Sequence, residues 1–115
     1  MSKVIISGFI DFGDKDVTPI LQGARELIEM TYDEPGCIHY VWSADVLRPG
    51  RVWVYEEWQS VETLAAHLVA DSYLRMSGYL AQSGLTGATV NKYLIATDEP
   101  VYDATGVARA EFSNR

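Results

Sequence analysis

Two histidines, His39 and His67, are the side chains best suited to proton transfer, because imidazole has an unperturbed pKa close to cellular pH. His67 lies beside Leu68 at the border of an apolar stripe on a predicted helix, from which a side chain could reach into a pocket. The alternative is a border histidine satisfied by a backbone carbonyl or by water. We take His67 as the candidate catalytic residue. His39 lies on a predicted strand, either as a binding residue or within an interface between subunits.

Aromatic residues are numerous for a chain of this size, with 3 Trp, 7 Tyr and 3 Phe. Together they could line a pocket for a flat ring system, although each one alone could equally pack in the core or in an interface. The candidate substrate-binding residues are His39, Tyr40, Trp42, Tyr55, Trp58 and Tyr73, and Tyr93 is a further aromatic of the same set.

Glu56 and Glu57 are adjacent on a predicted strand, so their side chains face opposite sides and cannot act as a paired acid and base. One of the two is expected to be buried. A buried carboxylate needs a hydrogen bond or a cation, which Arg51, Arg75 or Lys92 could supply.

Cys37 is the single cysteine, so no internal disulfide can form. No base or electropositive setting that would make its thiol a nucleophile is evident around it. No CxxC, HExxH or comparable metal-ligand spacing occurs in the sequence, which therefore predicts no metal site.

The length of 115 residues and a hydrophobic content of 48% predict one domain with a substantial core. The formal net charge of −7 disfavours phosphate backbones and anionic lipid, so we expect neither nucleic acid nor a membrane as partner. No segment is long and apolar enough for a signal sequence or a membrane span, and we expect a cytoplasmic protein.

Hydrophobic periodicity indicates alternating strands and helices. Ser60 is a good cap for the second helix, and Asp16 for the first. Gly8 interrupts a strand and indicates either a bulge or the close approach of a ligand or neighbouring backbone. The predicted strands are residues 3–12, 37–46, 51–58 and 89–97, and the predicted helices are residues 16–31, 60–68 and 73–82.

This order predicts an α+β fold, a ferredoxin-like βαββαβ domain with an antiparallel four-stranded sheet. Residues 1–99 form the domain, and residues 100–115 form a C-terminal tail that either wraps a partner or is disordered. Strand 51–58 is apolar on both faces, whereas two helices can cover only one face of the sheet. We therefore expect a homodimer in which the second copy packs on the other face.

Residues 34–79 carry a succession of short motifs whose order and spacing are more specific than any one of them. The motifs are Glu34-Pro35-Gly36-Cys37 with Tyr40, Tyr55-Glu56-Glu57-Trp58, and Leu64-Ala65-Ala66-His67-Leu68 with Tyr73. In these residues the chain resembles the antibiotic-biosynthesis monooxygenase family, a branch of the dimeric α/β-barrel proteins, and the likeness extends over residues 4–97. The resemblance implies a dimeric α/β barrel, a pocket between sheet and helices, and oxidation by molecular oxygen without flavin, haem or metal.

The haem-degrading branch of the same family does not fit the sequence. That branch uses an asparagine, a tryptophan and a histidine where this chain has Ser7, His67 and Ser77. The resemblance instead favours a cofactor-independent monooxygenase that acts on a quinol, phenol or anthrone-like substrate, with His67 as base or hydrogen-bond donor. Two alternatives stay open: a small-molecule isomerase or lyase on the same fold, which would not consume oxygen, and a non-catalytic ligand-binding dimer.

Overall fold

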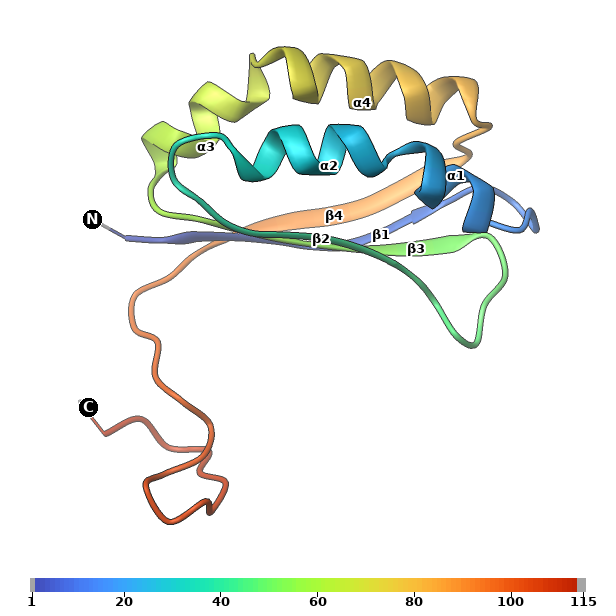
Figure 1. The fold of residues 1–115 in the computed structure, drawn as a ribbon. Helices are drawn as coiled ribbons and strands as arrows, with labels where there is room; N and C mark the ends of the chain where they lie inside the picture. Colours follow the sequence, from blue (N-terminus) through green and yellow to red (C-terminus); the bar gives the residue numbers. More distant parts are fainter. Residues whose placement is uncertain (1, 114–115) are drawn as a thin grey trace.

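The fold was examined in a computed structural model, which describes residues 2–113. Four strands and four helices form two layers, with all the helices on one face of a single sheet (Figure 1). Along the chain they are β1 (Val4–Asp11), α1 (Thr18–Gly23), α2 (Arg25–Tyr32), β2 (Cys37–Ala44), β3 (Arg51–Trp58), α3 (Val61–Leu68), α4 (Asp71–Gln82) and β4 (Gly87–Leu94).

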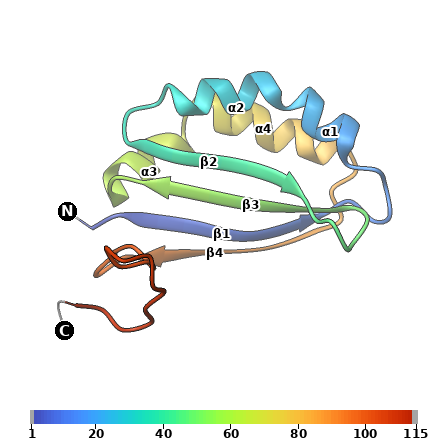
Figure 2. The same ribbon diagram turned by 60° about the horizontal axis from the view of Figure 1, so that its bottom comes forward.

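The four strands lie in the order β2-β3-β1-β4, and every neighbouring pair is antiparallel (Figure 2). In the central pair, Val4 is opposite Trp58 and Asp11 is opposite Arg51. A shift in register between Cys37 and His39 marks an irregularity in β2. This arrangement confirms the predicted ferredoxin-like α+β fold.

Alternate residues of β1 and β3 form the core beneath the helices. Val4 and Ile10 are buried on β1, and Val52, Val54 and Trp58 are buried on β3. The helices complete two apolar clusters, one around Trp58 and one around residues 10, 12, 17, 52 and 54. The period of two correctly grouped these residues on one face of each strand, and the structure shows that this face lies under the helices.

The first helical segment is divided, whereas the sequence predicts one helix over residues 16–31. The Tyr79 hydroxyl of α4 donates a 2.7 Å hydrogen bond to the carbonyl of Ile20, close to the division at Ala24. A Cβ atom on Gly23 would lie 2.2 Å from that hydroxyl. Glycine is a weak helix former and here leaves room for Tyr79, so a contact distant in sequence accompanies the break.

The boundaries of the other helices follow local signals. Ser60 caps α3: its hydroxyl accepts from the Thr63 N–H at 3.2 Å, and the Thr63 hydroxyl accepts from the Ser60 N–H at 3.1 Å. Asp16 accepts from the Thr18 N–H at 3.0 Å just before α1, but the N-cap position of that helix is Val17, not Asp16 as predicted. The helix α4 begins at Asp71, two residues before the predicted start.

Gly8 marks a close approach between two backbones. A Cβ atom at this position would lie 2.1 Å from the Thr89 carbonyl oxygen and 2.6 Å from Cα of Val90, both on β4. Any larger residue would push against backbone rather than against a flexible side chain. Of the explanations that the sequence leaves open, the neighbouring strand is the one observed.

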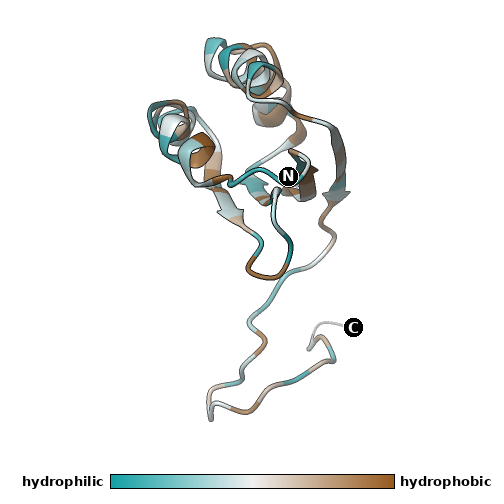
Figure 3. Ribbon diagram, turned by 90° about the vertical axis from the view of Figure 1, so that its right-hand side faces the viewer, coloured by the Kyte–Doolittle hydropathy of each residue, from teal (hydrophilic) through white to brown (hydrophobic). Residues whose placement is uncertain are grey.

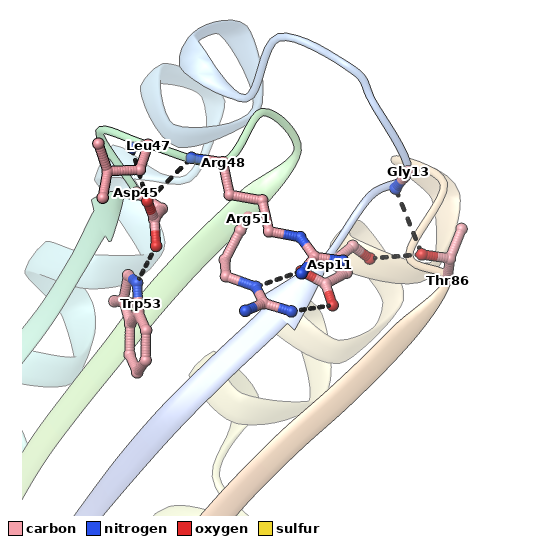
Figure 4. Close-up of polar contacts among 8 residues, drawn as sticks. All are labelled: Asp11, Gly13, Asp45, Leu47, Arg48, Arg51, Trp53 and Thr86. Carbon is pink, nitrogen blue, oxygen red and sulfur yellow. Dashed lines mark hydrogen bonds and ion pairs between the residues drawn. The ribbon is translucent and has the colours of Figure 1, made fainter.

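The face of the sheet opposite the helices carries an ordered aromatic and charged cluster. The guanidinium of Arg51 lies 3.5 Å from the ring centroid of Phe9 and binds Asp11 with Nε–Oδ1 at 2.8 Å. The ring of Trp53 packs edge-on against Phe9, with ring centroids 5.2 Å apart. Its indole N–H donates to Asp45 at 2.6 Å (Figure 4). Trp53 nevertheless remains 42% exposed, and no helix of residues 2–113 covers this open face (Figure 3).

The segment after β4 leaves the domain on the side opposite the helices (Figures 1 and 3). It contains a turn organised by Asp103, whose carboxylate accepts hydrogen bonds from the hydroxyl and backbone N–H of Thr105, from the backbone N–H of Val107 and from the Arg109 side chain. These hydrogen bonds hold the pKa of Asp103 at about 2. Tyr102 in this segment is 65% exposed.

Candidate functional site

A cavity of about 310 Å³ lies between the sheet and the helices α3 and α4. All four strands contribute to its walls, which are mostly apolar. The polar and aromatic lining residues are Tyr40, Trp42, Glu56, Tyr73 and Ser77. Sites for drug-sized ligands span roughly 300–1,000 Å³. The cavity therefore has room for a small ligand.

Glu56 is the carboxylate in the cavity wall, and it is 8% exposed. Burial disfavours the ionised form and raises the pKa of Glu56, although a hydrogen bond from Trp58 and the nearby His67 oppose that rise. The Trp58 indole nitrogen donates to Oε1 of Glu56 at 2.9 Å. Glu56 is thus the buried member of the adjacent pair, and its partner is this indole rather than any of the three predicted cations.

Two aromatic residues of β2 lie beside Glu56 in the cavity. Tyr40 is directly opposite Glu56 in the sheet, and Trp42 is opposite Val54. Burial raises the pKa of the Tyr40 hydroxyl far above its usual value. The indole nitrogen of Trp42 is buried and makes no hydrogen bond of good geometry within residues 2–113, although it lies near enough to the Tyr40 hydroxyl to oppose the rise in that group's pKa. An unpaired buried donor is costly, which makes this N–H a group that a ligand oxygen would stabilise.

His67 does not line the cavity, and its side chain is only 1% exposed. Its Nδ1 lies 2.8 Å from Oε1 of Glu34, and the Ser72 hydroxyl donates to the other oxygen of the same carboxylate. The ring is stacked on Trp58 with centroids 4.6 Å apart, and Tyr73 meets it edge-on at 5.5 Å. His67 therefore lies behind Trp58 and Tyr73, held by an acceptor on the turn between α2 and β2.

The remaining predicted site residues divide between two environments. Trp58 is fully buried next to the cavity. Tyr55 and His39 lie on the open face, where their rings are 6.4 Å apart and Tyr55 donates to Glu57 at 2.9 Å. The structure thus brings Tyr40, Trp42 and Tyr73 together around one cavity and places Tyr55 and His39 on the other side of the sheet.

Two features of the site were missed in the sequence analysis. Glu56 has the same strand parity as Val54 and Trp58, a signal that could have identified it as the buried glutamate. Glu34 was recognised only as part of a turn motif, because its contact with His67 spans 33 residues.

Burial and the nearby Glu34 and Glu56 raise the pKa of Cys37 to about 11, so its thiol stays protonated at neutral pH.

Solved structures of similar fold come from several bacteria. A proposed antibiotic biosynthesis monooxygenase from Deinococcus radiodurans aligns with a TM-score of 0.76 at 20% identity, covering 87% of this chain and 99% of that one. A possible oxidoreductase of unknown function from Bacteroides thetaiotaomicron aligns with a TM-score of 0.71 at 23% identity, covering 82% and 98%. A proposed monooxygenase of the same kind from Nitrosomonas europaea gives 0.71 at 20% identity, covering 82% and 90%. At these identities the likeness shows the fold alone.

The comparison with curated proteins gives no match to this sequence. Within residues 2–113 no helix has the length and apolar character needed to cross a membrane. The family model for antibiotic biosynthesis monooxygenases matches residues 16–78, a span that contains His67, Glu56, Tyr40 and Trp42. Because this match extends over more than half of the sequence, the chain belongs to the antibiotic biosynthesis monooxygenase family.

Proposed function

We propose that the protein is a cofactor-independent monooxygenase that oxidises a small aromatic substrate, a quinol, phenol or anthrone-like compound, with molecular oxygen. The observation that carries the proposal is the apolar cavity of about 310 Å³, whose aromatic walls contain a buried carboxyl group and an unpaired indole N–H. Its small volume and mostly apolar lining limit contact of a bound substrate with water, which favours reaction through a carbanion or phenolate. Membership of the family supports the same reaction.

The reaction balances without a further reductant when the substrate itself supplies the electrons. A base removes a proton from the substrate, and the resulting carbanion transfers electrons to oxygen and forms a carbon–oxygen bond. The peroxide oxygen takes up a proton, which gives a hydroperoxide at that carbon. Loss of the second hydrogen from the carbon, with cleavage of the oxygen–oxygen bond, leaves a carbonyl group and one molecule of water.

His67 supports this reaction from behind the cavity wall. Its ring fills the space under Trp58 and Tyr73, and its bond to Glu34 fixes the orientation of the imidazole. The proposed role of His67 is therefore to position Trp58 and Tyr73. This role modifies the direct proton transfer that the sequence alone suggested.

Oxygen uptake is the direct test of the proposed function. Purified protein, with a metal chelator present, is expected to consume oxygen with a quinol, phenol or anthrone faster than the substrate autoxidises. His67→Ala is expected to reduce this rate about 10- to 100-fold, because displacement of the cavity wall misplaces the substrate. The readout is the rate on an oxygen electrode, with the unfolding midpoint of each variant measured alongside.

His39→Ala is the matched variant, since its ring lies on the opposite face of the sheet, and its rate is expected to equal that of the wild type. Absence of uptake across the whole panel would argue against the oxygenase. Substrate conversion without oxygen uptake would favour the isomerase or lyase, and binding without conversion would favour the non-catalytic alternative.

We further propose that the protein works as a homodimer in which the open faces of two sheets pack together. On this face Val41 is 44% exposed, Trp53 42% and Tyr93 49%. Large apolar side chains in one exposed sheet face are typical of a surface that another protein covers. A second copy presents the same face and can supply a complementary partner.

Light scattering at micromolar concentration is expected to give twice the mass of the chain. Trp53→Glu places a charge on the open face and is expected to yield the mass of one chain. Leu74→Glu is a matched control, because Leu74 is also exposed but lies on the helix α4. A wild-type protein with the mass of one chain would contradict the proposed dimer.

A further inference from the structure

We propose that Glu56 is the catalytic base of this cavity and that the indole N–H of Trp42 binds the oxygen atom of the substrate on which negative charge develops. This inference rests on the proposed function and deepens it, because it names the proton acceptor and the kind of substrate that would match it. The substrate is a flat fused-ring ketone whose acidic ring methylene and oxygen atom lie on opposite sides of a ring.

The position of Glu56 is the first reason. Among the described residues that line the cavity, Glu56 carries the one carboxyl group, and only Tyr40 and Tyr73 of the others can titrate. One carboxyl oxygen, Oε1, accepts the Trp58 N–H at 2.9 Å, which holds the group in a fixed orientation. The carboxylate retains further lone pairs that can accept a proton from a bound molecule.

The other candidate bases are excluded by their surroundings. His67 lies outside the cavity lining and is bound through Nδ1 to Glu34. The phenol of Tyr40 stays protonated because burial raises its pKa. The thiol of Cys37 stays protonated for the same reason. A carboxylate whose pKa is raised by burial is a stronger base than an ordinary one, and Glu56 is in that condition.

Trp42 supplies the complementary donor. Because Tyr40 is opposite Glu56 and Trp42 is opposite Val54, Trp42 and Glu56 are diagonal neighbours on the same face of the sheet. Such positions are separated by about 7–8 Å. The unpaired N–H of Trp42 and the carboxyl group of Glu56 can therefore contact opposite sides of one flat molecule between them.

The proton transfer is balanced with these two groups alone. The carbon–hydrogen bond of an acidic ring methylene breaks, and the proton moves to a carboxyl oxygen of Glu56. The electron pair enters the ring system and generates an enolate, whose oxygen accepts the hydrogen bond from Trp42. No oxidant takes part in this step, so it can be observed separately from the reaction with oxygen.

The test is hydrogen exchange without oxygen. Anthrone, a three-ring ketone with its acidic methylene opposite the carbonyl, is incubated with the protein in deuterium oxide under nitrogen. Exchange of the methylene hydrogens is followed by NMR. The wild type is expected to exchange them faster than buffer, and Glu56→Gln is expected to be slower by about 100-fold or more, the usual contribution of a general base. Trp42→Phe is expected to be slower by about tenfold, as for one lost hydrogen bond to developing charge.

Glu57→Gln is the matched control, since it makes the same chemical change one residue along the strand and on the opposite face, and its exchange rate is expected to equal that of the wild type. Quenching of tryptophan fluorescence by anthrone shows whether Glu56→Gln still folds and binds. Wild-type exchange no faster than buffer, or undiminished exchange in Glu56→Gln, overturns the inference. Exchange that depends on Glu56 without any oxygen uptake would contradict the oxygenase and leave the assignment of Glu56 standing.

Discussion

Trp58→Ala is expected to lower the free energy of unfolding by about 3–5 kcal/mol, the range for removal of a large buried aromatic side chain. Trp58 has 0% exposure and belongs to the cluster that joins Val4, Leu27 and Leu64. The substitution would also remove the ring on which His67 stacks and the N–H that binds Glu56. Urea unfolding followed by circular dichroism measures the change.

Trp58→Phe separates packing from hydrogen bonding. It keeps an aromatic ring but removes the donor to Glu56, so the expected loss is smaller, about 1–3 kcal/mol for a buried acceptor left unpaired. The lost hydrogen bond also stabilises the ionised carboxylate, so its removal should raise the pKa of Glu56 further. A loss below about 1 kcal/mol in Trp58→Ala would show that the cluster does not depend on this ring.

Glu56→Gln is expected to make the protein more stable than the wild type at neutral pH, on the order of 1 kcal/mol, because a buried charge is replaced by a neutral isostere. Burial raises the pKa of Glu56 in the folded state above its unfolded value. Between those two values the folded protein binds more protons than the unfolded chain, so wild-type stability falls as pH rises through this window. The variant should lack that component of the decline.

The pH dependence of stability reflects the interactions of Glu56 with several neighbouring groups and not Glu56 alone. Trp58 of β3, His67 of α3, Glu34 of the α2–β2 turn and Tyr40 of β2 all interact with its carboxyl group. The experiment is therefore a comparison of urea unfolding across pH in the wild type and in Glu56→Gln.

Glu57→Gln is a control for which the opposite change in stability at neutral pH is expected. Burial acts to raise the pKa of Glu57, but hydrogen bonds from Tyr55 and Lys3 outweigh it and lower the pKa. An acid with a depressed pKa contributes stability above its unfolded value, and this contribution is lost as the pH falls. Glu57→Gln should therefore destabilise the protein at neutral pH. If Glu56→Gln also lowered the free energy of unfolding at neutral pH, the ionised carboxylate of Glu56 would stabilise the fold rather than destabilise it.

Much of the fold could be predicted because it depends on local patterns. The period-two alternation of Val52, Val54 and Trp58 predicted that they share one face of β3, and Ser60 predicted the start of α3. Gly8 indicated either a bulge or a close approach of a ligand or backbone, and the structure shows the close approach of the β4 backbone. Each of these signals lies within a few residues of the feature that it specifies.

The site was harder to predict because it depends on contacts between distant segments. The sequence placed His67 at the edge of an apolar helical stripe. Only the tertiary structure shows that its ring packs against Trp58 and Tyr73 and that its Nδ1 is hydrogen-bonded to Glu34. The break between α1 and α2 has the same origin, since the hydroxyl of Tyr79 comes from α4. Periodicity identifies which face a residue occupies and gives no information on which neighbours meet it there.

Strand β3 has a consequence for how such a protein can change over evolutionary time. Its even-numbered residues from Val52 to Trp58 serve the cavity and core, and its odd-numbered residues from Arg51 to Glu57 serve the open face. A single-residue insertion near its start would exchange the two sets, turning Trp58 outward and Glu57 into the core. The alternation of side chains along this strand therefore tolerates substitutions but no one-residue insertion or deletion.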